Sequence, residues 1–314
     1  MVAASLRALL TQIVDYAGLF PPASLPLDQA VRSYARYRHE PEAWMLGRFI
    51  CPATRLVELT PFLTLFRSTP PFACSVLGRA VQSAAELLEG FRSDIVSIKA
   101  FREAHGGQVR VDSYEVRLPV EVVQYGPERA SDFVCQLQRL SPEALAPLAM
   151  WYEFSFGANW RQALADVVPV VTGRGGIKVR CGGQDAAAFP TVEQLAFAIT
   201  TCRDAEAPLK FTAGLHHPIR RFDPGVPANM HGFLNVFCAS VLAEARRLGE
   251  AQVQNILTDE APDHFAFDEE GFRWRELRAT TAEIAMARRR LATSFGSCSF
   301  DEPRDDLRTL GLLP

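Results

Sequence analysis

Short apolar runs rich in β-branched and aromatic residues alternate with helix-like stretches through most of this chain. Repeated alternation of this kind predicts βα units and a parallel sheet with right-handed crossovers, either closed as a barrel or open. The predicted strands are residues 45–51, 71–78, 109–118, 148–155, 175–181 and 208–213. The predicted helices that follow them are residues 54–66, 80–104, 127–140, 158–166, 191–203 and 230–248.

The length of 314 residues suits one α/β barrel with additions at its ends. Because the pattern gives six βα units and not eight, we expect a TIM-barrel-like (β/α)8 fold or an incomplete barrel, with an N-terminal helical extension and a C-terminal tail. No linker marks a boundary, so we expect residues 1–314 to form a single domain. Its parts are a helical segment with a Pro-rich loop (1–43), the βα units (44–250), and a hairpin, a helix and a tail (251–314).

The Pro-rich loop, residues 15–23, is unusually apolar for a surface loop. Its prolines and its glycine end one short helix before the next begins. Asp15 and Tyr16 at its start suggest either a lid over a site or a hydrophobic plug at the closed end of the barrel.

The balance of charges and the cysteine pattern exclude several classes of protein. The chain has 33 Lys plus Arg against 36 Asp plus Glu, a formal net charge of −3, so it lacks the basic excess that nucleic-acid binding needs. Its apolar runs, such as 233–242, are too short to span a bilayer, and we see no signal peptide. Seven scattered cysteines without C-x-x-C spacing argue against disulfides and thiolate zinc. We expect a cytoplasmic protein without nucleic-acid or membrane partners, and leave a homo-oligomer open.

Four successive predicted strands carry charged residues, although a buried parallel strand should be almost continuously apolar. Because side chains alternate along a strand, the two members of each pair share one face. Unpaired buried charges are costly, so we expect these groups to face the barrel interior near its C-terminal end, where barrel active sites lie. The alternative is an ion-pair network that only closes the barrel. The pairs are Glu115 with Arg117, Glu153 with Ser155, Lys178 with Arg180, and Lys210 with Thr212.

Lysine is rare in this chain. Among the 33 basic residues only Lys99, Lys178 and Lys210 are lysines, and the rest are arginines. A general drift toward arginine removes lysine wherever any positive charge suffices, so the surviving lysines mark positions where an amine is required. Two ammonium groups on adjacent strands would repel each other, which favours one neutral, nucleophilic amine.

Glycines and histidines follow these strands. Gly182 and Gly183 precede a helix that opens at Thr191, an arrangement that favours anion binding. Because His216 and His217 are adjacent, we expect only one of them to reach the site. Either histidine could act as general acid or base, or could bind a divalent metal together with His231 and a glutamate. The simpler interpretation of His231 is a residue at a helix start bonded to a backbone carbonyl.

The two lysine segments, IKVRCGG (177–183) and LKFTAG (209–214), resemble the strand ends of class I aldolase-type (β/α)8 barrels, in particular the deoxyribose-phosphate aldolases. The resemblance implies that Lys210 forms a Schiff base, that Lys178 is its electrostatic partner, and that Gly182 with Gly183 holds phosphate. The chain departs from that family in its length, the position of its Gly-Gly turn, its two histidines and its long tail. Residues 15–23 and 214–218 also resemble segments of a bacterial family.

Together these features predict an enzyme, a lyase of the aldolase type or an isomerase, that acts on a small anionic carbonyl metabolite. We expect catalysis from Lys210, Lys178, Glu153, Glu115 and His216. We expect substrate binding by Arg180, Arg117, Thr212, Gly182, Gly183, His217 and His231. No cofactor is expected; the alternative is a divalent metal held by His216, His231 and Glu153. A non-catalytic metabolite-binding protein is the alternative outside the enzymes.

Overall fold

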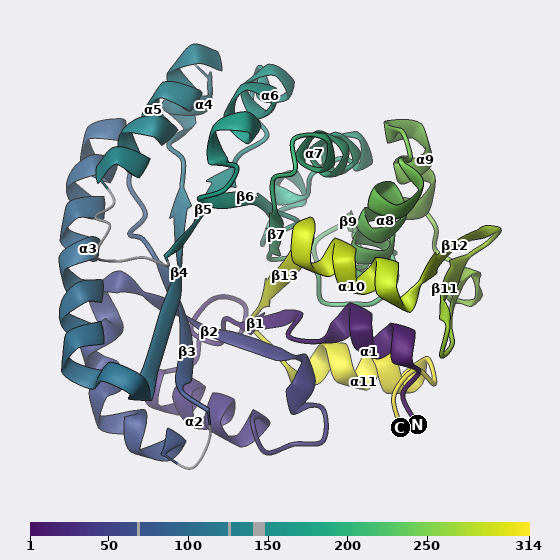
Figure 1. The fold of residues 1–314 in the computed structure, drawn as a ribbon, viewed down its shortest axis with the longest axis horizontal. Coiled ribbons are helices and arrows are strands. Elements are labelled where there is room, and N and C mark those ends of the chain that lie inside the picture. The colour runs from purple at the N-terminus through teal and green to yellow at the C-terminus, as the bar shows by residue number, and fades with distance from the viewer. Residues whose placement is uncertain (68–69, 125–126, 141–147) are drawn as a thin grey trace.

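The computed structural model describes residues 1–67, 70–124, 127–140 and 148–314. Its centre is a closed parallel barrel of eight strands surrounded by helices (Figure 1), in the order β1-β13-β7-β6-β5-β4-β3-β2. The TIM-barrel-like α/β fold is confirmed, and the alternative of an incomplete barrel is wrong. The strands are β1 Val14–Tyr16, β2 Leu46–Pro52, β3 Phe72–Leu77, β4 Val109–Arg117, β5 Ala149–Phe154, β6 Gly175–Arg180, β7 Leu209–Thr212 and β13 Ala292–Ser297.

The sequence pattern does not predict two of the eight strands, β1 and β13. These two strands pair with each other and close the barrel. β1 lies in the segment expected to be helical with a Pro-rich loop, and β13 lies in the expected C-terminal tail. They pair in parallel, with Val14 opposite Phe295 and Tyr16 opposite Ser297. β1 has three residues, too few for an alternating pattern, and the small polar residues of β13 (ATSFGS) look like a turn.

The helices that cover the barrel follow the predicted order. They are α1 Ala4–Leu10, α2 Leu27–Tyr37, α3 Ala84–His105, α4 Val120–Gln124, α5 Pro127–Leu140, α6 Trp160–Val171, α7 Val192–Asp204, α8 Phe233–Arg246, α9 Glu250–Leu257, α10 Thr281–Arg290 and α11 Asp301–Thr309. A capping box between Thr191 and Gln194 begins α7. Residues 53–66 form a 3₁₀ helix, η2, and contain Pro61, which lacks the N–H that a continuous α-helix uses. Among the described residues, no helix is both long and apolar enough to cross a bilayer.

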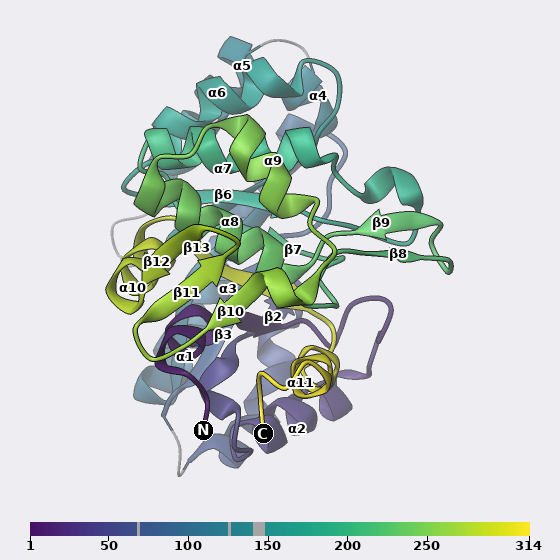
Figure 2. The same ribbon diagram turned by 90° about the vertical axis from the view of Figure 1, so that its right-hand side faces the viewer.

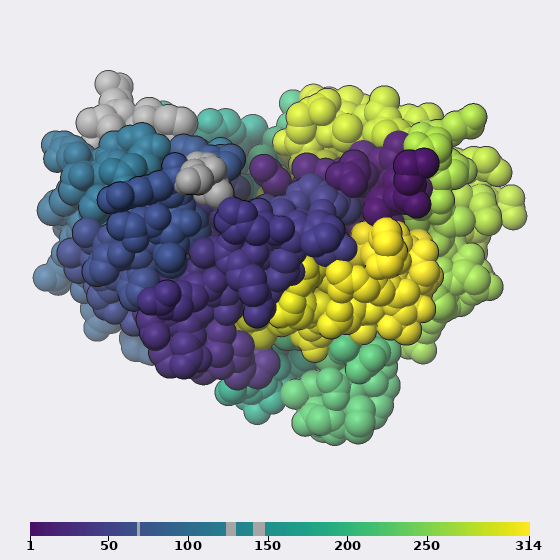
Figure 3. Space-filling model, turned by 90° about the horizontal axis from the view of Figure 1, so that it is seen from below, coloured from purple at the N-terminus to yellow at the C-terminus, as the bar shows by residue number. Residues whose placement is uncertain are grey.

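Two small antiparallel sheets are attached to the barrel. The hairpin predicted within residues 251–314 is part of a three-stranded sheet of β10 Phe265–Phe267, β11 Gly271–Trp274 and β12 Leu277–Thr280. A second hairpin, β8 Arg221–Asp223 with β9 Ala228–Met230, projects from the body of the molecule (Figure 2). The first and last segments of the chain lie beside each other on one face (Figure 3), as their pairing through β1 and β13 requires.

Apolar and charged side chains lie on opposite sides of the barrel strands. Outside the strands, apolar side chains pack against the helices and form one continuous core. On the inner side of the strands, five charged residues each have less than a twentieth of their surface exposed: Asp15, Glu115, Glu153, Lys178 and Lys210. The fold therefore concentrates its buried charge along the barrel axis.

Candidate active site

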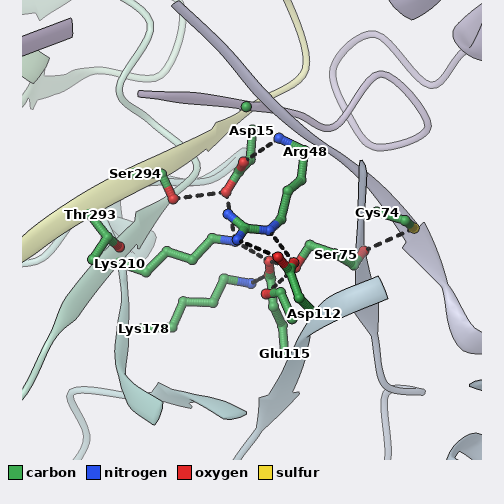
Figure 4. A network of polar contacts seen from close by, with 12 residues as sticks. Asp15, Arg48, Cys74, Ser75, Asp112, Glu115, Lys178, Lys210, Thr293 and Ser294 are labelled. Atoms are coloured by element: carbon green, nitrogen blue, oxygen red, sulfur yellow. Dashed lines mark hydrogen bonds and ion pairs between the residues drawn. The ribbon is translucent and has the colours of Figure 1, made fainter. Parts of the chain in front are cut away.

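Buried charges of alternating sign contact one another through the interior of the barrel. Glu115 of β4 is the central member, since its Oε2 lies 2.8 Å from Nζ of Lys178 and its Oε1 contacts Nζ of Lys210 (Figure 4). Lys178 in turn lies 2.7 Å from Oε2 of Glu153, whose Oε1 is 3.2 Å from Nε of Arg180. Because strand side chains alternate, residues of β4, β5, β6 and β7 reach this one interior. Arg117, which the strand pattern also predicted to face the interior, is exposed at the end of β4. The other charged residues of the prediction contact one another as expected: Glu115, Glu153, Lys178, Arg180 and Lys210.

Asp15 extends the chain of ion pairs beyond Lys210, a position that the sequence pattern did not predict for it. Its Oδ2 lies 2.8 Å from Nζ of Lys210 and accepts a 2.8 Å hydrogen bond from Ser294. Its Oδ1 accepts a 2.6 Å hydrogen bond from the backbone N–H of Arg48. Asp15 itself is therefore a strand residue and not part of a lid, whereas Phe20, Pro21 and Pro22 of the same segment line a cavity at the C-terminal ends of the strands. A single acidic residue inside the apolar run Ile13–Tyr16 was the available signal.

Three acidic and three basic side chains form this network of ion pairs. Because their charges cancel, the free-energy cost of burying them is reduced. Burial alone raises the pKa of Glu115, but the ammonium groups of Lys178 and Lys210 outweigh it and hold that pKa well below its usual range. Burial likewise raises the pKa of Glu153, and the cations Lys178 and Arg180 lower it to a net decrease. The set, from one end to the other, is Asp15, Lys210, Glu115, Lys178, Glu153 and Arg180.

Lys178 is held in its charged form. Burial lowers the pKa of its amine, but the carboxylates of Glu115 and Glu153 outweigh burial and raise the pKa above its usual range. The expectation that repulsion between two lysines leaves one amine neutral is wrong for Lys178, because Glu115 lies between the two amines and compensates both.

A cavity of about 770 Å³ opens at the C-terminal ends of the strands. The last residues of five strands line it: Leu77, Arg117, Arg180, Thr212 and Ser297. Deeper in the barrel, Lys178 lines it together with Glu115 and Glu153. Its lining thus combines one ammonium group, two guanidinium groups and five carboxylates, the other three being Asp185, Asp223 and Glu302. Its volume suits a small metabolite.

Lys210 lines a different cavity. It has the same register as Lys178 on the neighbouring strand, but barrel strands are tilted, so residues in register lie at different heights along the axis. Its side chain is 1% exposed and lines a second cavity, of about 470 Å³, together with Gln12 before β1 and Thr293 near the start of β13. The expectation that both lysines lie at the C-terminal end is correct for Lys178 and wrong for Lys210.

His216 and His217 both line the C-terminal cavity, although only one was expected to reach it. The chain is not extended before them, since Ala213 and Gly214 have left-handed backbone conformations with φ of 56° and 69°. Each ring bonds a carboxylate of α11: Nδ1 of His216 lies 2.8 Å from Glu302 and Nδ1 of His217 lies 2.5 Å from Asp306. The hydrogen bond from His216 lowers the pKa of Glu302.

His231 and Gly182 have structural positions outside the lining of that cavity. His231 is buried, and its Nε2 lies 2.8 Å from the backbone carbonyl of Pro190, as the simpler interpretation proposed. Burial lowers the pKa of His231 to about 4. A Cβ on Gly182 would lie 2.7 Å from Cα of Gly214, so Gly182 permits a close approach of two turns. Gly183 does line the cavity.

The alternative metal set is not assembled. In the described part of the chain, no three His, Cys, Asp or Glu side chains gather as a metal site requires. His216 is bonded to Glu302, and His231 is bonded to Pro190. The three residues proposed as ligands, His216, His231 and Glu153, therefore do not form one donor set.

Comparisons with known proteins show distant similarity to solved structures. No family model matches the chain, and no curated protein matches it in sequence. A deoxyribose phosphate aldolase from Aeropyrum pernix, described as a tetramer, is 12% identical with a TM-score of 0.44, over 69% of this chain and 86% of that one. A putative deoxyribose-phosphate aldolase from Toxoplasma gondii ME49 is 9% identical with a TM-score of 0.38, over 98% and 93% of the two chains.

A third solved structure, Rhizobium etli pyruvate carboxylase, is 12% identical with a TM-score of 0.40, over 81% of this chain and 25% of that chain. The assignment of the fold itself rests on the strand order of the closed barrel.

Proposed function

We propose that this protein is an enzyme that makes or breaks a bond next to the carbonyl group of a small anionic metabolite, by aldol-type cleavage or by enolisation. One observation carries the proposal: the Lys178 ammonium lines the C-terminal cavity between two buried carboxylates, at 2.8 Å and 2.7 Å. Chemistry next to a carbonyl needs a positive group to stabilise the enolate oxygen and a base to move the proton. Lys178 and a glutamate supply these two groups.

Arg117 and Arg180 support an anionic substrate. Both line the cavity, and guanidinium groups hold carboxylates and phosphates through two parallel hydrogen bonds. Arg180 is 41% exposed in its side chain, so it can turn from Glu153 toward a ligand without crossing the packed interior. The substrate class we propose is therefore a carbonyl compound with a carboxylate or a phosphate.

Glu153 is the better candidate for the base. Glu115 contacts two lysines and accepts a 2.6 Å hydrogen bond from Ser75, so it has three polar partners. Glu153 contacts one lysine and the half-exposed Arg180. When a substrate anion draws Arg180 away, Glu153 loses one neighbouring cation, and its pKa rises toward that of a working base.

A reaction through an imine would use the same two groups, Lys178 and Glu153. The amine of Lys178 must first pass its proton to Glu153, 2.7 Å away, before it attacks the substrate carbonyl and water leaves. Lys210, which the aldolase resemblance favours for the imine, lines the other cavity. Our proposal therefore assigns any imine to Lys178.

The test is exchange of substrate protons in D₂O, followed by proton NMR. The panel comprises small 2-keto acids and hydroxyaldehyde or hydroxyketone phosphates. We expect loss of the signal of the proton next to the carbonyl for one class, with wild-type protein and with the control Lys99→Met, whose side chain is 58% exposed. Borohydride reduction and peptide mapping then separate the routes: an adduct on Lys178 indicates an imine, and exchange without an adduct indicates the ammonium route. Binding without exchange across the panel would overturn the enzyme and support a metabolite-binding protein.

A further inference from the structure

The second cavity lies at the opposite end of the barrel from the proposed active site. It has a volume of about 470 Å³ and is lined by early residues of several strands and by α10. Four of its lining side chains are basic, and none of its described lining residues is acidic: the four are Arg48, Lys210, Arg288 and Arg289. A concave surface with one sign of charge concentrates ions of the other sign.

Two of these cations form no ion pair with a carboxylate of the described residues. Arg288 donates to the backbone carbonyls of Thr11, Ala292 and Thr293, and its Nε is buried with no hydrogen-bond partner in the described part of the chain. Burial lowers the pKa of this guanidinium, and the carboxylate of Asp15 opposes that decrease only in part. Arg289 is exposed and makes no ion pair among the described residues.

The other two cations of the cavity are paired. Arg48 bonds Asp112 at 2.7 Å, and Lys210 bonds Asp15 at 2.8 Å. Ser294 and Thr293 also line the cavity (Figure 4), but their hydroxyl groups already donate to Asp15 and to the backbone carbonyl of Leu209. The groups that remain for an oxyanion are therefore the guanidinium groups of Arg288 and Arg289.

We propose that this cavity is a binding site for a small oxyanion, a phosphate or carboxylate group, at the N-terminal end of the barrel. The anion would lie between Arg288 and Arg289 and would supply the counter-charge that the described residues do not provide. Its volume falls in the range of small-molecule sites. The site is independent of the proposed activity, because it uses none of the residues that line the C-terminal cavity.

The test is calorimetric titration of the full chain with inorganic phosphate and, separately, with citrate, at ionic strength held constant with sodium chloride. Arg289→Ala removes one guanidinium from an exposed position, and Arg290→Ala is the matched control, an exposed neighbour outside the cavity that is 3.3 Å from Glu206. We expect Arg290→Ala to bind as wild type. We expect Arg289→Ala to lose at least about tenfold in affinity, as loss of a charge-assisted hydrogen bond predicts.

The C-terminal cavity also has arginines, so a third variant separates the two sites. Arg117→Ala removes a guanidinium from the C-terminal cavity only. Anion binding that survives Arg117→Ala and weakens in Arg289→Ala supports the proposal, and the stronger of the two probes identifies phosphate or carboxylate as the ligand group. Binding that Arg117→Ala abolishes and Arg289→Ala leaves unchanged would overturn it, as would no binding of either probe.

Discussion

Replacing Glu115 by glutamine tests whether the buried charges stabilise the barrel as a balanced set. The change keeps the size of the side chain but leaves two carboxylates, Asp15 and Glu153, among three cations. Lys178 and Lys210 each lose one of their two partners inside the barrel. Removing one member of a buried ion pair costs about 3–5 kcal/mol, and we expect Glu115→Gln to reduce the free energy of unfolding by that amount.

Urea unfolding at pH 7, followed by circular dichroism, measures this loss. The matched control is Glu58→Gln, which breaks an exposed pair with Arg55 and should cost less than about 1 kcal/mol. Because the pKa of Glu115 is depressed in the folded state, its contribution is fully present above about pH 4.3, the unfolded value, and is lost as pH falls through the folded pKa. The difference between wild type and variant should therefore narrow in acid. Equal stability at pH 7, or a difference that grows in acid, would refute the reasoning.

Three further predictions concern single residues. Asp15→Asn should destabilise the fold by about 3–5 kcal/mol in the same urea assay, since it removes the carboxylate that β1 places beside Lys210; a loss below that of Glu58→Gln would contradict the role of Asp15. Arg180→Ala should raise KM by at least about tenfold for the substrate class found by proton exchange. The control Arg92→Ala, which changes an exposed arginine of α3, should leave KM unchanged. An unchanged KM in Arg180→Ala would contradict a contact between Arg180 and the substrate anion. The imidazole of His231 should titrate near pH 4 by NMR, because burial lowers its pKa. Its contribution to the stability of the fold is present above the pKa of the unfolded state, about 6.5, and declines as pH falls toward 4. Titration near 6.5 would contradict its burial.

The sequence predicts the part of the fold in which each strand carries a long apolar run. The six strands from β2 to β7 were recognisable because each is bounded by turn residues and followed by a helix. β1 and β13 were not recognisable, because they lack a long apolar run and are held in place by their pairing in the closed barrel. Their pairing with each other joins segments almost the whole chain apart, and no local pattern reports such a contact.

The sequence also predicts part of the candidate site. Charged residues at alternate positions of buried strands indicated that Glu115, Glu153, Lys178 and Lys210 share one interior. The height of each side chain along the barrel axis was not predictable, because it depends on strand tilt and register. For that reason Lys210 was assigned to the wrong end of the barrel, and Asp15, on a strand too short to recognise, was left out.

The central claim is that Lys178 and Glu153 together act on the substrate, and one comparison of exchange rates tests it. Lys178→Met with Glu153→Gln removes one charge of each sign, so the buried set keeps two cations and two carboxylates and stays neutral. Near-UV circular dichroism confirms that the double variant is folded. With the best substrate in D₂O, we predict that its exchange rate falls by at least about 10²-fold against Lys99→Met. A folded double variant that exchanges at the control rate would contradict the account.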